Sequence, residues 1–283
     1  MSVIKLFKSR RRKVGWSYST KGYLWRLVPS ENGLFVIEDR EVEGRNVTFA
    51  CLDRRTGTVL WQGLALREQW WITVDRVHND ILFLHEYASP DMPEQKKIYA
   101  IDLASGKLLW SNEEMKLAFI DKTSVYAGKD DILNRKFFEL DLMTGAVKSE
   151  IAEETLDAVR ANASTTANIV HFPAVFENAG ESGFVANSVH QATKKARNVV
   201  LTEVLEIGGN AVIGYYEHSG PVTEQKFRQH IAVAESPAAD IVFEDVISSE
   251  ASVPVPDTFF AIDSMMYYIK DKKQLTALNL APR

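Results

Sequence analysis

The chain has a single cysteine, Cys51, among its 283 residues. One cysteine cannot form an intramolecular disulfide, so the sequence gives no sign of an oxidising compartment. No apolar run approaches the ~18 residues that a membrane-spanning helix needs. The N-terminal charges come after only a few apolar residues, whereas a secretory signal places ~7–15 apolar residues after its charges. These absences predict a cytoplasmic protein without a transmembrane segment.

Positive charge is not in excess either. Lys and Arg number 33 against 38 Asp and Glu, which gives a formal net charge of −5. A general nucleic-acid binder shows a basic face, so we expect no nucleic-acid partner. The one concentrated basic stretch lies within residues 1–13. Charge runs are usually solvated, and we interpret this one as a basic N-terminal arm; a weak tether to an acidic partner or an anionic membrane is the alternative.

What the chain does contain is an internal repeat. Residues 50–61, 100–110 and 140–149 share one order: an apolar stretch, an Asp, a short turn with Gly, and a second stretch. The first two copies end in Trp61 and Trp110, and the third lacks the tryptophan. Each copy of such a repeat is one supersecondary unit that stacks on the next, so the repeat predicts architecture more firmly than chemistry.

Each copy is predicted to form a β-hairpin. The Asp begins the turn and accepts backbone N–H bonds, and the Gly supplies the left-handed conformation that a type I turn with a bulge requires. The turn residues are, in chain order, Asp53 and Gly57, Asp102 and Gly106, and Asp141 and Gly145.

Two more strands are predicted before each hairpin, at 23–28 and 33–38 in the first unit and at 71–77 and 80–84 in the second. Each unit is therefore a four-stranded antiparallel sheet with apolar residues on both faces. Radial stacking into a β-propeller covers both faces and leaves only short edges. The sequence predicts an all-β protein with a single β-propeller domain over residues 14–283.

The spacing of the copies fits six blades. A further copy is visible at 231–243, where Phe243 replaces the tryptophan, and another is expected at 155–198, with strands at 168–172 and 183–187. Seven blades fit only if that last segment holds additional strands.

The two ends of the chain complement each other. The last strand, 274–280, has Asn279 in the place of the turn acid, and no further strand follows it. Near the N-terminus, residues 14–18 contain Trp16 with no strands before them. We predict that this N-terminal strand pairs with 274–280 in the last blade and closes the ring.

The pattern Ala-x-Asp-x-x-Thr-Gly-x-x-x-Trp resembles the tryptophan-docking repeat of quinoprotein-like (PQQ-like) β-propellers. In that family the tryptophans pack against the neighbouring blade, which implies structural docking roles for Trp16, Trp61 and Trp110. The family's dehydrogenases are periplasmic and longer, and they bracket the quinone with a tryptophan and a disulfide of adjacent cysteines. Its outer-membrane lipoprotein has an acylated cysteine. Since this chain lacks these features, the resemblance implies the fold, and we expect no cofactor.

Small polar residues lie between the first and second strands of the predicted blades. Hairpin turns favour Asn and Asp, which accounts for them without a ligand. In six-bladed lactonase-like enzymes such side chains bind an axial calcium ion, so a propeller hydrolase with an axial divalent metal is the alternative function. These residues are Asn32, Asn79, Asp121, Asn168, Asn210 and Asp263.

No local pattern identifies catalytic, cofactor-binding or metal-binding residues. His85, His171 and His218 fall late in second strands without zinc spacing, and we interpret them as structural. Trp70 and Trp71 precede an innermost strand and point to opposite sides, so one of them is a candidate anchor for a partner, as is the proline-containing loop 87–95. The sequence therefore favours a monomeric, non-enzymatic scaffold that binds a protein partner.

Overall fold

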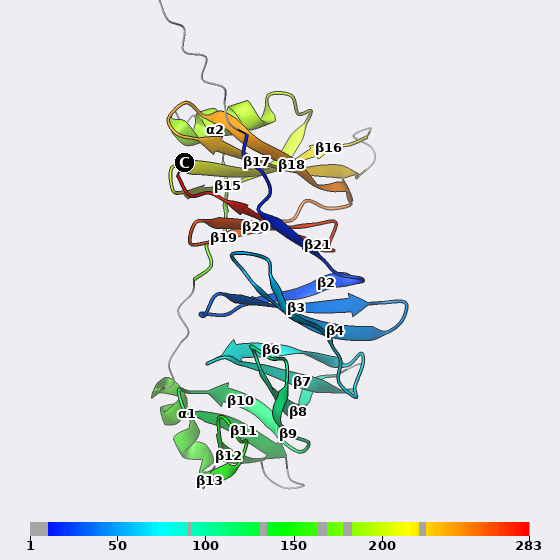
Figure 1. The fold of residues 1–283 in the computed structure, drawn as a ribbon, viewed down its shortest axis with the longest axis vertical. Coiled ribbons are helices and arrows are strands. Elements are labelled where there is room, and N and C mark those ends of the chain that lie inside the picture. Colours follow the sequence, from blue (N-terminus) through cyan, green and yellow to red (C-terminus); the bar gives the residue numbers. More distant parts are fainter. Residues whose placement is uncertain are drawn as a thin grey trace, which may run out of the picture. The chain divides into compact units, whose positions relative to one another are not determined.

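The computed structural model describes residues 11–89, 92–130, 135–162, 169–177, 183–220 and 225–282. These residues form an all-β protein of five antiparallel sheets with two short helices (Figure 1). The chain divides into two compact units, which we name the N-unit (Thr20–Asn168) and the C-unit (Met1–Ser19 with Ile169–Arg283). Neither described helix is long and apolar enough to cross a membrane.

The N-unit contains three four-stranded sheets whose strands follow one another in chain order. Sheet I consists of β2 (Tyr23–Pro29), β3 (Leu34–Glu41), β4 (Asn46–Asp53) and β5 (Val59–Leu64). Sheet II consists of β6 (Ile72–His78), β7 (Ile81–Ser89), β8 (Met92–Asp102) and β9 (Leu108–Asn112). Sheet III consists of β10 (Lys116–Ile120), β11 (Ser124–Asp130), β12 (Arg135–Asp141) and β13 (Val147–Ile151).

Sheet II is buried on both faces, as its apolar runs predict. Successive side chains of a strand point to opposite faces, so β7 sends Leu82 and Leu84 toward sheet I and Ile81 and Phe83 toward sheet III. All four side chains are buried. The three sheets therefore stack in the order I, II, III (Figure 1).

A helix covers the remaining face of sheet III. Helix α1 (Glu153–Asn162) begins with two glutamates and has Arg160 in its last turn, charges that suit the helix dipole. Its Leu156 packs with Phe119 and Phe137 of sheet III.

The C-unit contains two sheets. Sheet IV has the order β14 (Ala174–Val175), β15 (Val199–Ile207), β16 (Asn210–His218), β17 (Phe227–Glu235) and β18 (Asp240–Ala251). Sheet V has the order β1 (Trp16–Ser19), β21 (Gln274–Asn279), β20 (Met265–Lys270) and β19 (Phe259–Ile262). One face of sheet IV packs on sheet V, with Phe243 against Tyr268, and helix α2 (Phe184–Thr193) covers its other face (Figure 1).

The predicted pairing of the N-terminal segment is confirmed. Strand β1 is the outer strand of sheet V, antiparallel to β21, with Trp16 opposite Ala277 and Ser19 opposite Gln274. The prediction of a solvated arm does not hold at Arg12, which is 7% exposed. Residues 1–10 of that arm lie outside the described residues.

The prediction of a further four-stranded blade at 155–198 is wrong for the described part of that segment. Residues 184–193 form α2, and between 169 and 172 only His171 makes an isolated bridge, to Ala261. A short apolar run such as 184–186 suits a strand or a helix. The four-residue spacing of buried Ser188 and Ala192 is helical, and it brings both residues onto sheet IV.

The predicted loop 87–95 is for the most part a hairpin. Strands β7 and β8 continue the ladder outward, pairing Tyr87 with Gln95 and Ser89 with Met92. Pro90 and Asp91 lie outside the described residues.

Candidate functional site

The three Asp-Gly turns have one geometry. In each, the Asp carboxylate accepts a hydrogen bond from the backbone N–H three residues later, and the Gly N–H donates to the Asp carbonyl oxygen. The Gly N to Asp O distances are 2.9, 2.8 and 2.9 Å in chain order. The glycine φ angles of 73°, 69° and 69° lie in the left-handed region. The residues are Asp53 and Gly57, Asp102 and Gly106, and Asp141 and Gly145.

The tryptophan of sheet I reaches the turn of sheet II. The Trp61 Nε1–H donates to the carbonyl oxygen of Leu103 at 2.8 Å. The indole also lies over Gly106, where a Cβ atom would come within 2.9 Å of the ring. The turn glycine is thus required by its conformation and by the ring of the neighbouring sheet.

The same contact joins sheets II and III. The Trp110 Nε1–H donates to the carbonyl oxygen of Leu142 at 3.0 Å, and a Cβ atom on Gly145 would lie 2.6 Å from the indole. Ser149 occupies the equivalent position of sheet III, where helix α1 takes over the cover of the sheet.

The register of this position is the same in all five sheets. The residue two before the turn acid pairs with the docking position: Cys51 with Trp61, Ala100 with Trp110, Glu139 with Ser149, Val233 with Phe243, and Ala277 with Trp16. Phe243 therefore stands in for the tryptophan in sheet IV, and β1 supplies Trp16 to sheet V from the other end of the chain.

An aromatic cluster lies beside the start of β2 and β6, and we name it the Trp25 cluster (Tyr23, Trp25, Arg40, Trp70 and Trp71). The Arg40 guanidinium carbon lies 5.4 Å from the ring centroids of both Trp25 and Trp70. Trp71 meets Trp70 edge to face at 6.4 Å. Trp25 is 61% exposed and Tyr23 is 42% exposed, so the two β2 aromatics form the open part of the cluster.

Three hydrogen bonds fix the position of the Arg40 guanidinium. Its Nε donates to the Glu38 carboxylate at 2.7 Å, and its two terminal nitrogens donate to the carbonyl oxygens of Trp70 and Ile72 at 3.0 and 2.7 Å. Glu38 is fully buried and also accepts from Thr73 Oγ1 at 2.8 Å. The arginine is therefore pre-positioned under the Trp25 ring.

The backbone before β6 is held in a similar way. The Glu68 carboxylate accepts from the N–H groups of Trp70 and Trp71 at 3.0 and 2.8 Å. Burial alone would raise the pKa of Glu68, but these bonds outweigh it and the pKa is lowered. Sequence reasoning does not single out Arg40; the available signal is two charged residues, Glu38 and Arg40, on one face of an apolar strand.

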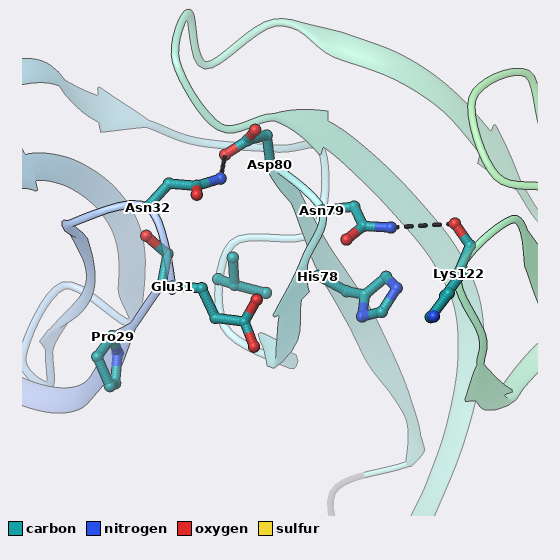
Figure 2. A pocket seen from close by; sticks show the side chains of 9 residues that line it. Pro29, Glu31, Asn32, His78, Asn79, Asp80 and Lys122 are labelled. Carbon is teal, nitrogen blue, oxygen red and sulfur yellow. Dashed lines mark hydrogen bonds between the residues drawn. The ribbon is translucent and has the colours of Figure 1, made fainter. Parts of the chain in front are cut away.

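The polar turn residues join neighbouring sheets (Figure 2). Asn32 Nδ2 donates to the Asp80 carboxylate at 2.6 Å, and Asn79 Nδ2 donates to the Lys122 carbonyl oxygen at 3.0 Å. Asn79 and Asp80 have φ angles of 44° and 61°, as a tight hairpin turn requires. Asn168 lies outside the described residues.

The other turn residues also have protein partners. Asp121 accepts from the N–H groups of Thr123 and Ser124 and from the Tyr126 hydroxyl at 2.9, 2.8 and 2.9 Å. Burial alone would raise the pKa of Asp121, but these bonds outweigh it and lower the pKa. The Asn210 amide oxygen accepts from Arg12 at 3.1 Å, and Asp263 has a φ angle of 54° in the β19–β20 turn.

The three candidate histidines each have different surroundings. His85 Nδ1 is 3.2 Å from the Asp75 carboxylate, His218 packs on Phe227, and His171 lies at the isolated bridge. Among the described residues, no group of three His, Cys, Asp or Glu side chains is placed to hold a metal ion.

Comparison with known families matches part of the chain. Residues 28–110 match a domain of unknown function, DUF4905. This segment runs from the end of β2 to Trp110 and contains the two best-preserved repeats. A comparison with curated proteins gives no significant match.

Several solved structures match most of the chain at low identity. An exo-β-1,3-galactanase from Phanerochaete chrysosporium is 10% identical, with 93% of this chain and 63% of that chain covered and a TM-score of 0.29. The β-propeller domain of the Trilobed protease from Pyrococcus furiosus is 9% identical, with 89% and 64% covered and a TM-score of 0.32. BBS1N in complex with ARL6DN is 9% identical, with 97% and 98% covered and a TM-score of 0.34. This chain spans less than two thirds of the galactanase and protease chains.

Proposed function

We propose that this protein is a non-enzymatic, cytoplasmic interaction scaffold that uses the Trp25 cluster to bind a protein partner. The observation that carries the proposal is the exposure of Trp25 above a fixed arginine. A tryptophan that serves only the core is mostly buried, whereas this ring is 61% exposed. Arg40 lies over one face of the Trp25 ring, and the exposed part of the ring leaves apolar area for another molecule.

The composition of the cluster suits a protein interface. Trp, Tyr and Arg are the residues most enriched at binding hot spots, because they combine large contact area with a polar handle. The ordering cost of binding is small here, since Arg40 makes three hydrogen bonds before any partner arrives. We expect the partner to place an apolar side chain against Trp25.

The scaffold that presents this cluster is, in our proposal, a monomeric β-propeller closed by β1. Within each unit the sheets have four main antiparallel strands in a constant docking register. In this scaffold Trp61, Trp110 and Trp16 are the docking residues, and the Asp-Gly turns provide the surfaces on which such tryptophans pack. Such a scaffold is rigid, which favours a pre-formed binding surface.

The proposal is tested by crosslinking at the cluster. A photoreactive amino acid replaces Tyr23, and the protein is irradiated in its native host. We expect one reproducible crosslinked partner whose yield falls about thirtyfold with Trp25→Ser, since truncating a hot spot costs ~2 kcal/mol or more.

Val59→Ser is the matched control, because Val59 is 38% exposed on β5 of the same sheet and lies outside the cluster. This control leaves the yield unchanged if the proposal is correct. Equal yields from wild type and Trp25→Ser, with both proteins folded by circular dichroism, would show that the cluster does not bind a partner.

A further inference from the structure

A cavity of about 540 Å³ lies among the turns that join the first and second strands of sheets I, II and III. This volume falls in the range of small-molecule sites, roughly 300–1,000 Å³. Figure 2 shows Glu31, from the β2–β3 turn, and His78, from the end of β6, extending into the same open space. The Trp25 cluster lies toward the opposite end of strand β2, so this cavity is separate from the proposed protein-binding surface.

The walls of the cavity are fixed by contacts that use donors. Asn32 donates one amide N–H to the Asp80 carboxylate, and Asn79 donates one to the Lys122 carbonyl oxygen. His78 Nε2 lies 2.8 Å from the Asp121 carbonyl oxygen. Carboxylate and carbonyl oxygens only accept hydrogen bonds. Asn32, Asn79 and His78 are therefore the donors in these contacts within the cavity wall.

What remains for a ligand is mostly a set of acceptors. The amide oxygens of Asn32 and Asn79 stay available, although each amide also keeps one N–H, and Nδ1 of His78 accepts when Nε2 carries the ring proton. Glu31 adds an exposed carboxylate for which the described residues provide no hydrogen bond or ion pair, and Asp80 adds a second carboxylate. The one cationic side chain among the lining residues is Lys122.

We propose that this cavity binds a small organic ligand through a primary ammonium group. An ammonium ion offers three donors and a positive charge, which complement the Glu31 carboxylate and the neighbouring acceptors. The acceptors belong to three separate turns, and no three carboxylate or imidazole groups of the described residues converge on one point. That spread favours an extended amine over a single metal ion.

Two kinds of ligand share this chemistry: a simple diamine, and an amino acid zwitterion whose carboxylate pairs with Lys122. The following titrations distinguish them. Isothermal titration calorimetry is run with 1,4-diaminobutane, 4-aminobutyrate, butyrate and 1,4-butanediol. We expect at least one of the two amines to bind, and the diol and butyrate not to bind. If 4-aminobutyrate is the ligand, Lys122→Gln weakens it and leaves the diamine unaffected.

Glu31→Gln is the decisive variant, because it removes the charge and keeps the size of an exposed side chain. We expect it to weaken amine binding about tenfold or more, since a hydrogen bond to a charged group is worth ~1.5–3 kcal/mol. Glu43→Gln, an exposed glutamate in the β3–β4 loop, is the matched control and keeps full affinity.

Three results would overturn the proposal: no amine binds, butanediol binds as well as the diamine, or Glu31→Gln binds amines as wild type does. A calcium titration completes the test. Calcium binding that excludes the diamine and is lost in Glu31→Gln would replace the amine site with a metal site. Loss of partner crosslinking in the Trp25→Ser variant is independent of all these outcomes.

Discussion

Gly145 shows how one atom decides the contact between two sheets. Its φ of 69° already disfavours any other residue, and a Cβ atom there would lie 2.6 Å from the Trp110 indole. We expect Gly145→Ala to lower the free energy of unfolding by about 3 kcal/mol, from ~1–2 kcal/mol of backbone strain and a similar steric penalty. Urea denaturation measures the loss.

Gly33 provides the matched control. Its φ is 84°, but nothing lies within 4 Å of an added Cβ atom. Gly33→Ala should therefore cost only the backbone strain, about 1–2 kcal/mol. When each substitution is made separately in a Trp110→Ala background, Gly33→Ala and Gly145→Ala should lower the free energy of unfolding by the same amount. Equal losses at Gly33 and Gly145 in the wild-type background would refute the steric role of Trp110.

Residues whose role is local were predictable from the sequence. The turn acids bond to groups two or three residues away, so Asp53 and its equivalents carry their partners in their own segment. Arg40 was not predictable, because two of its acceptors are carbonyl oxygens about 30 residues away. Arg12 was even less predictable, because the glutamate that it contacts, Glu235, lies far away in the sequence.

At the scale of elements, the first described residues fasten sheet V to sheet IV. Arg12 donates to Glu235 at 2.9 Å, to the carbonyl oxygen of Asn279 at 2.6 Å and to the Asn210 amide oxygen at 3.1 Å. Four residues later, β1 begins its ladder with β21. One side chain therefore links the start of β16, the end of β17 and the end of β21.

Replacing Arg12 tests this link. We expect Arg12→Gln to lower the free energy of unfolding by about 2–3 kcal/mol, because buried acceptors lose charged donors. Lys13→Gln is the control and should leave the free energy of unfolding unchanged, because Lys13 is exposed and Arg12 makes the contacts to sheets IV and V. Deletion of residues 1–20 removes β1 as well and should cost more than Arg12→Gln. A melting temperature unchanged by that deletion would show that β1 adds nothing to the stability of sheet V.

Helices α1 and α2 mark the limit of element prediction. Strands in the repeats were found because each hairpin has an Asp, a Gly and flanking β-formers. The segment 153–198 has no such turn, and its short apolar runs suit either structure. In the structure each helix covers one face of a sheet, which is the burial that an additional sheet would otherwise provide.

At the scale of the whole molecule, the decay of the repeat did not hide the antiparallel sheets that contain it, although the copy predicted at 155–198 is not a sheet in the described residues. The docking register persists where the tryptophan is lost, at Ser149 and at Phe243, because strand pairing depends on the backbone and on the alternation of buried residues. The site is less predictable than the fold, since Trp25, Arg40 and Trp70 come together from β2, β3 and the segment that precedes β6.

Acid pH should destabilise both units, through carboxylates that are held ionised in the folded chain. Burial alone would raise the pKa values of Asp75 and Asp245, but hydrogen bonds outweigh it and both pKa values are lowered. The bonds to Asp75 come from His85 and Arg76, and those to Asp245 from Lys270 and Tyr268. The unfolded chain therefore takes up protons first as the pH falls below about 4, the ordinary pKa of Asp.

The stability that these groups contribute is thus complete above that value and is lost as the pH falls through the lowered folded pKa values. Melting temperatures measured from pH 7 to pH 3 should fall most steeply below pH 4. Asp75→Asn should be less stable than wild type at pH 7 and show a shallower decline in acid, because it no longer takes up that proton. Asp157→Asn, on the exposed side of α1, is the control and should follow the wild-type curve. Parallel acid declines for wild type and Asp75→Asn would show that Asp75 does not contribute to acid sensitivity.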